Sequence, residues 1–251
     1  MKATEFEFRQ RFWLIMLLFW GGFWLYGLDH VNVTDWAARH TIPGSGPLDR
    51  IFDRAAFAFA AFLLLLAAWL RTWAAAYLQS SVVHDAQLHS EAIVANGPYR
   101  YMRNPLYLGG LLLTVGIGFL ASRAGFVFMV VGMTLLYFRL MGLEEANLSR
   151  EQGAPYREFC RLVPRFWPSL TPRVPRGNLA PKWGQAFLGE LFMWGFFVGV
   201  ACFAVTLNIH ITWWIIGVTL GLWIIRAFVI HRHTKTRQGS APQPDGGSAS
   251  L

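Results

Sequence analysis

Charged side chains are scarce: they make up 14% of the 251 residues, against 55% hydrophobic residues. A soluble domain carries about 25% charged residues, so this chain has too few polar side chains to cover a water-exposed surface. Its apolar residues gather in long runs. The composition predicts a single integral membrane domain over residues 1–237, without a separate soluble module. Residues 238–251, rich in Gly, Ser, Pro and Ala, are expected to be a disordered tail.

Cysteine is nearly absent, since only Cys160 and Cys202 occur, which excludes a disulfide framework and a Cys-based zinc cluster. His84, Asp85 and His89 are potential ligands on one helix face, but they are as easily interfacial or capping residues, so we expect no metal. No basic stripe with interleaved aromatics lies outside the apolar runs, and we expect no nucleic-acid partner.

Six apolar runs predict an all-α fold, a polytopic membrane helix bundle of about six transmembrane helices. A helix needs about 20 residues to cross the hydrocarbon core, with roughly 17 as a lower limit, so the third run is marginal. The first run follows basic residues, as a signal peptide does, but it is longer than the usual apolar core of about 7–15 residues. The six runs are Phe12–Leu28, Ala55–Leu78, Pro105–Ala121, Ala124–Gly142, Gln185–Leu207 and Ile211–Ile230.

Lys and Arg outside these runs lie mostly on one side of the expected membrane. Fifteen fall on the side of the termini and of the second and fourth loops, and four on the other. The positive-inside rule therefore predicts that both termini are cytoplasmic. Within the runs, Arg71, Arg139, Glu190 and Arg226 all fall in the cytoplasmic portion. They fit side chains that snorkel to the interface and also a polar cavity that opens to the cytoplasm.

The first polar motif precedes the third apolar run. Asn104 is a strong N-cap and Pro105 suits the first helical position, so a helix start is predicted here. A helix N-terminus beside arginines is a ready anion site. The simpler alternative is a capped helix with interfacial anchors. The surrounding candidates are Tyr99, Arg100, Arg103 and Tyr107.

The second motif begins with Glu144 and Glu145, which the apolar pattern places at the end of the fourth helix. A helix C-terminus repels anions, so two carboxylates there need cationic partners or a bound cation such as an ammonium or sulfonium group. Tyr156 and Phe159, which follow, suggest a helix lying at the interface. Because only Ser122 and Arg123 separate the third and fourth runs, a tight hairpin should bring both motifs to one membrane face.

The two motifs together resemble the superfamily of isoprenylcysteine carboxyl methyltransferases and phospholipid methyltransferases. The resemblance rests on Gly-x-Tyr-x-x-x-Arg-Asn-Pro-x-Tyr-x-Gly from Gly97, on Glu-Glu-x-x-Leu-x-x-x-x-Gly-x-x-Tyr from Glu144, and on Val163-Pro164, and it covers residues 91–168. It implies an integral membrane enzyme that uses S-adenosylmethionine. It also implies a cytoplasmic-side cofactor pocket lined by Tyr99, Arg100, Arg103, Asn104, Pro105, Tyr107, Glu144 and Glu145.

Three departures from the superfamily pattern concern the methyl acceptor more than the cofactor. Many relatives have His at the position of Asn104, a second Tyr at that of Phe159, and a basic residue at that of Leu162. The resemblance therefore leaves the acceptor open among a prenylated cysteine, a phospholipid amine, a small thiol and other lipophiles. We expect a lipophilic acceptor that enters from the bilayer.

The expected mechanism is direct displacement, in which the enzyme aligns the nucleophile with the methyl group and excludes water. Arg103 or Arg165 would orient a carboxylate acceptor, and Glu145 would take the proton from an amine acceptor. Two other classes remain open: an NADPH-dependent reductase of the sterol type, and a transporter or scaffold without catalysis. Basic residues between Arg150 and Lys182 suit the reductase, whereas the sequence lacks the inverted repeats and paired broken helices typical of transporters.

Overall fold

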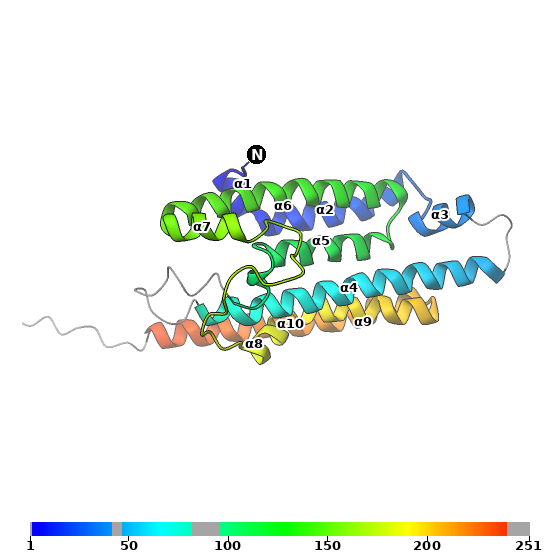
Figure 1. Cartoon of the computed structure of the whole chain (residues 1–251). Coiled ribbons are helices and arrows are strands. Elements are labelled where there is room, and N and C mark those ends of the chain that lie inside the picture. Colours follow the sequence, from blue (N-terminus) through cyan, green and yellow to red (C-terminus); the bar gives the residue numbers. More distant parts are fainter. Residues whose placement is uncertain (1, 42–46, 82–95, 240–251) are drawn as a thin grey trace, which may run out of the picture.

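The computed structural model describes residues 2–41, 47–81 and 96–239 (Figure 1). Most of the described residues are helical, and these residues form no strand apart from one isolated bridge between Asn32 and Ser122. The suggested metal ligands at 84, 85 and 89, motif residues 91–95 and the tail from 240 lie outside them. The helices are α1 Glu5–Arg9, α2 Arg11–Trp24, η1 Leu25–Gly27, α3 Val33–Thr41, α4 Pro47–Ser81, η2 Gly97–Arg100, α5 Pro105–Gly118, α6 Arg123–Glu151, α7 Ala154–Leu162, α8 Trp183–Gly189, α9 Leu191–Thr206 and α10 Ile209–Gly239.

The bundle consists of roughly parallel helices that run back and forth along one axis (Figure 1). α5 packs on both α4 and α6, so it joins the two halves of the bundle. α2 packs on α6 on one side, and α9 packs between α4 and α10 on the other. This alternation places the start of α5 and the end of α6 at the same end of the bundle (Figure 1).

The membrane helix bundle predicted from the sequence is confirmed, but the count of six spans is not. Arg50–Leu78 of α4, the whole of α6 and Ile209–Arg226 of α10 are long and apolar enough to cross a membrane. α8 and α9 would form a fourth span together, although they are bent by 61° relative to each other. α2 and α5 have 14 residues each, which is about 21 Å of helix and short of the 30 Å hydrocarbon core.

Helix ends differ from the ends of the apolar runs. α6 continues to Glu151 and α10 to Gly239, well beyond Gly142 and Ile230. Leaving the membrane does not end a helix, since polar residues with good helix propensity prolong it. α6 stops only before Gly153, whose φ of 65° lies in the left-handed region. The predicted fifth helix is instead interrupted at Glu190, between α8 and α9.

Small residues hold α4 and α5 together. Ala60, Leu64 and Ala67 of α4 are fully buried. A Cβ added to Gly116 of α5 would lie 2.8 Å from the Leu64 side chain and 3.1 Å from the Ala60 carbonyl. Such contact requires glycine, so Gly116 serves close helix packing rather than a ligand cavity.

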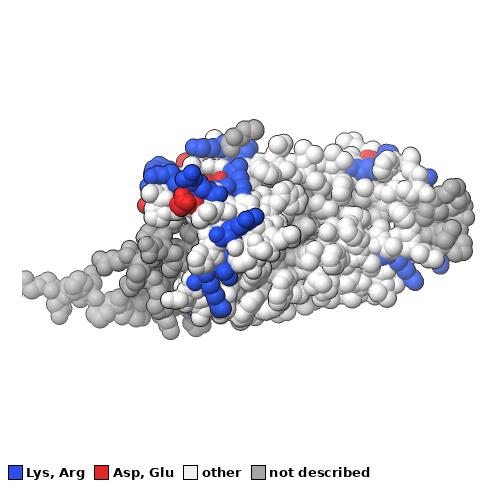
Figure 2. All heavy atoms as spheres, in the orientation of Figure 1, with Lys and Arg blue, Asp and Glu red and all other residues white. Residues whose placement is uncertain are grey.

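The face shown in Figure 2 has charge at its two ends and an almost uncharged band between them. Lys and Arg are most numerous at the end that carries α1 and α7 (Figure 2). At the opposite end, Asp29 pairs with Arg123 at 3.0 Å. Asn32 there donates to the Tyr26 hydroxyl at 2.8 Å and to the Ala121 carbonyl at 3.1 Å. These contacts fasten the segment after α2 to the α5–α6 turn.

Candidate functional site

The two sequence motifs meet at the charged end of the bundle. Residues 100–103 lie against residues 164–173 through three main-chain hydrogen bonds of 2.9 Å. These join Arg103 N to the Pro164 carbonyl, Ser169 N to the Tyr101 carbonyl and Arg173 N to the Arg100 carbonyl. We refer to residues 164–173 as the strap.

Glu145 is the centre of this meeting point. Its Oε1 accepts a hydrogen bond from Asn104 Nδ2 at 3.0 Å and lies 3.3 Å from Arg103 Nη1. Its Oε2 lies 3.1 Å from Arg165 Nε. The Asn104 amide also donates to the Arg165 carbonyl at 3.0 Å. The Arg103 and Glu145 side chains are only 14% and 16% exposed, so water screens this charge cluster weakly.

The structure changes two interpretations of the sequence. α5 begins at Pro105 as predicted, but the Asn104 side chain makes no capping hydrogen bond and binds Glu145 instead. Glu144 and Glu145 do not lie at a helix C-terminus, because α6 continues to Glu151. The repulsion between a helix C-terminus and a carboxylate is therefore not the reason why these glutamates need cationic partners. Glu145 nevertheless has the cationic partners that were expected, and they are Arg103 and Arg165.

Glu144 has different surroundings from its neighbour. The Tyr107 hydroxyl lies beside its carboxylate, and Arg11 is the cation whose field reaches it. Within the described residues, Glu144 forms no ion pair of the kind that Glu145 makes. Of the two adjacent carboxylates, Glu145 thus pairs with guanidinium groups, whereas Glu144 in the described residues has the Tyr107 hydroxyl beside it.

Tyr99 carries a buried hydroxyl. It has no hydrogen-bond partner among the described residues, and the charges near it are those of Arg71, Glu144 and Glu190. Burial raises the pKa of Tyr99 well above its usual value, so the phenol stays protonated and can donate. A buried polar group without a partner is uncommon in proteins, and here it fits a group that receives a ligand.

Arg100 is not brought to the two glutamates. Its Nε donates to the Val174 carbonyl at 2.9 Å, so the side chain holds the segment after the strap. Pro105 is buried at the first position of α5 and sets the start of that helix. Tyr107 packs edge-on against Tyr137 of α6, with ring centroids 5.3 Å apart.

One ion pair near this end of the bundle was not predicted from the sequence. Arg71 of α4 binds Glu190, at the α8–α9 break, through two hydrogen bonds of 2.8 and 3.0 Å. Both residues were noted as charges within apolar runs, and opposite charges on the same side of a membrane indicate a pair. Arg139 likewise binds Glu7 of α1, at 2.7 Å, and is not a lone snorkelling side chain.

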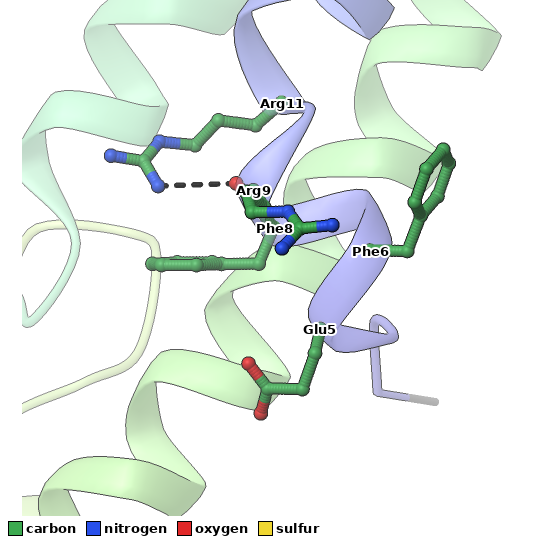
Figure 3. A pocket seen from close by; sticks show the side chains of 5 residues that line it. All are labelled: Glu5, Phe6, Phe8, Arg9 and Arg11. Carbon is green, nitrogen blue, oxygen red and sulfur yellow. Dashed lines mark hydrogen bonds between the residues drawn. The ribbon is translucent and has the colours of Figure 1, made fainter.

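A hollow of about 540 Å³ lies beside α1 at the same end of the bundle (Figure 3). Phe6, Phe8, Glu5, Arg9 and Arg11 line it. The Arg11 guanidinium lies 4.4 Å from the centre of the Phe8 ring and donates to the Phe8 carbonyl at 3.2 Å (Figure 3). Arg11, which lines this hollow, is also the cation whose field reaches Glu144.

The described part of the chain contains no group of three or more His, Cys, Asp or Glu side chains able to hold a metal ion. The side chains that meet at the site are carboxylates, guanidinium groups and phenols. Such groups suit an organic ligand that carries both a positive charge and polar substituents.

A polytopic helical membrane protein with two convergent polar motifs is the class that fold and site define. The phospholipid methyltransferase family matches residues 55–153, which run from α4 to just beyond the end of α6. Over this segment the chain is thus similar to the superfamily of membrane methyltransferases that its motifs resemble. No curated protein and no solved structure gives a significant match.

Proposed function

We propose that this protein transfers a methyl group from S-adenosylmethionine to a lipophilic acceptor at the membrane, in the manner of an isoprenylcysteine carboxyl methyltransferase. The proposal rests on the contact between Asn104 and Glu145, which joins the two superfamily motifs in one partly buried site. The family match supports methyl transfer as the reaction. The cytoplasmic orientation of the site remains a prediction from the distribution of Lys and Arg.

The cofactor pocket in this proposal combines the first motif with the two glutamates. Glu144, which has no ion pair within the described residues, faces the sulfonium charge, and the Tyr99 hydroxyl donates to a polar group of the cofactor. Glu145 holds Arg103 and Asn104 in place and so shapes the pocket wall. Tyr107, Pro105 and Arg165 complete this wall, whereas Arg100 supports it from the strap side.

The sulfonium supplies a methyl group that is already activated, so the protein mainly aligns the acceptor and excludes water. Arg103 is suited to orient a carboxylate acceptor, because its buried Nε has no hydrogen-bond partner among the described residues while its Nη1 faces Glu145. A carboxylate is already anionic at neutral pH and needs no base. An amine acceptor would need one. The sequence suggested Glu145 as this base, but both of its carboxylate oxygens are engaged. Glu144 is therefore better placed than Glu145 to take the proton.

A phospholipid amine is the second candidate acceptor. The observation that favours it is the description of the matching family as phospholipid methyltransferase. Both acceptors are lipophilic, and the almost uncharged band on the face shown in Figure 2 is the surface that would contact the bilayer from which they come. The two candidates differ in whether a proton must leave the nucleophile, and they predict different pH dependence of the transfer.

The test uses purified protein in detergent or vesicles with methyl-labelled S-adenosylmethionine. Small prenylcysteine mimics, amine-bearing phospholipids and a total membrane lipid extract are offered as separate acceptors, and the labelled product is identified. Label in the prenylcysteine ester supports the first acceptor, and label in the phospholipid supports the second. Binding of NADPH without binding of S-adenosylmethionine would overturn the proposal in favour of a reductase. Binding of neither would leave the transporter or scaffold alternative.

A further inference from the structure

Arg71 and Glu190 form an ion pair inside the bundle. The Arg71 Nε and Nη2 atoms donate to the two carboxylate oxygens of Glu190 at 2.8 and 3.0 Å, and the side chains are 23% and 10% exposed. Charges within a membrane bundle are costly and are retained where they serve a purpose. Glu190 lies outside residues 55–153, so the family match does not account for the pair.

Arg71 makes a third contact, with α5. Its Nη1 donates to the Leu106 carbonyl at 3.3 Å, in the first turn of that helix. The Arg71 side chain passes directly over Gly109, where a Cβ would lie only 2.5 Å from Arg71 Cγ. Leu106 is two residues beyond Asn104, so this hydrogen bond fixes the turn that presents Asn104 to Glu145.

Glu190 is itself held by the C-terminal helices. It lies at the break between α8 and α9, which are bent by 61°. Trp194 of α9 donates to Thr72 of α4 at 3.1 Å, next to Arg71. Trp223 of α10 donates to the Gly189 carbonyl at 2.8 Å. The position of the Glu190 carboxylate therefore depends on α9 and α10.

We propose that Arg71 and Glu190 are positioning residues through which α9 and α10 fix the start of α5 and thereby the methyl-donor pocket. This inference rests on the proposed function for its effect on the cofactor. The guanidinium is suited to the task because its planar fork binds the carboxylate in a bidentate manner and still has a donor for Leu106. A lysine at position 71 keeps the charge but cannot make all three contacts in this geometry.

The test compares Arg71→Lys and Glu190→Gln with Asp29→Asn. Asp29 pairs with Arg123 at 3.0 Å at the opposite end of the bundle, so its variant controls for the loss of an ion pair alone. Three quantities are measured for each purified variant: the dissociation constant of S-adenosylmethionine, the midpoint of thermal unfolding, and amide hydrogen exchange of residues 97–108. Arg71→Lys keeps the buried carboxylate paired with a cation, so it addresses the inference even where Glu190→Gln fails to fold.

We expect Arg71→Lys and Glu190→Gln to weaken cofactor binding at least about tenfold, which is about 1.4 kcal/mol, and to speed exchange of residues 97–108. Asp29→Asn should change neither. If the three variants have the same dissociation constant for the cofactor and the same exchange rates, the inference is overturned. The Arg71–Glu190 pair would then be a structural contact without a positioning role. If the wild type does not bind S-adenosylmethionine, the proposed function fails, while faster exchange in the first two variants alone still supports the positioning role.

Discussion

The Asn104 amide donates to the Glu145 carboxylate at 3.0 Å, across 41 residues of sequence. Asn104 precedes α5 and Glu145 lies in α6, so this hydrogen bond exists only because the two helices form an antiparallel pair. The same amide donates to the Arg165 carbonyl, and one side chain thus links α5, α6 and the strap.

Replacing Asn104 with aspartate should weaken the binding of S-adenosylmethionine at least tenfold. The substitution keeps the shape of the side chain but puts a carboxylate where an amide donates to Glu145 and to the Arg165 carbonyl. Loss of a hydrogen bond to a charged group costs about 1.5–3 kcal/mol, and repulsion between the carboxylates adds to it. Equilibrium binding of the labelled cofactor measures the effect. Arg161→Ala is the control, since that side chain is 80% exposed at the same end of the bundle.

Arg103→Ala and Glu145→Ala should each abolish cofactor binding while the protein still inserts into the membrane. Glu145→Ala leaves Arg103 without its carboxylate partner, and Arg103→Ala leaves Glu145 with Arg165 as its remaining cation. Both changes disturb a weakly screened charge cluster, since the Arg103 and Glu145 side chains are only 14% and 16% exposed. Because the two residues contact each other, the double variant should lose little more than either single one. Membrane fractionation and cofactor binding provide the measurements. Normal affinity in both single variants would contradict the site assignment.

Glu144→Gln should discriminate between the methyl donor and its demethylated product. The donor has a positive sulfonium and the product a neutral thioether, and the Glu144 carboxylate is the one that no ion pair occupies in the described residues. We expect a loss of about 1–2 kcal/mol in binding the donor and a smaller loss in binding the product. Competition binding with both ligands measures this. An equal loss for the two would show that Glu144 does not face the charge.

Acid should release α1 from α6. The Arg139 guanidinium and the capping contacts at Thr4 lower the pKa of Glu7 from 4.5 to about 2. A depressed carboxyl pKa means that the stabilisation is present above pH 4.5 and is lost as the pH falls toward 2. The protection factors of the amides of residues 3–10, which correct the exchange rates for their intrinsic pH dependence, should therefore fall across this window. Glu7→Gln should show low protection at every pH, without the transition.

Asn32→Ala should lower the thermal stability of the bundle from its other end. Its amide binds the Tyr26 hydroxyl and the Ala121 carbonyl, and its oxygen accepts from Thr34 N at 2.7 Å. Leaving these groups unpaired costs about 1–3 kcal/mol. The control is Asn208→Ala at the same end, because Asn208 Oδ1 accepts only the local hydrogen bond from His210 N.

The helix order and the meeting of the motifs were predictable, because both follow from hydrophobic run lengths and a two-residue turn. Ser122 caps α6 as a tight hairpin requires, accepting a hydrogen bond from Gly125 N. The bidentate pair of Arg71 with Glu190 was not predictable, since it spans 119 residues and depends on the bend between α8 and α9. No Pro or Gly pair marks that bend, which tertiary contacts at Thr72 and Gly189 hold.

The end of α6 shows the same limit. Hydropathy indicates where a helix leaves the bilayer but not where its main-chain hydrogen bonds stop. The sequence therefore placed Glu144 and Glu145 at the end of the helix, whereas α6 ends at Glu151. The role of Asn104 was misjudged for a related reason. Its position before Pro105 fits a cap, but a stronger partner, the Glu145 carboxylate, competes for its amide.

Three main-chain hydrogen bonds hold the strap to residues 100–103. Main-chain hydrogen bonds do not depend on which side chain a position carries. Trp167 and Leu170 in this segment are 73% and 100% exposed, so substitutions there leave its path intact. The exposed positions of this segment are thus free to vary in side chain, whereas Arg165, which pairs with Glu145, ties the same segment to the charge cluster.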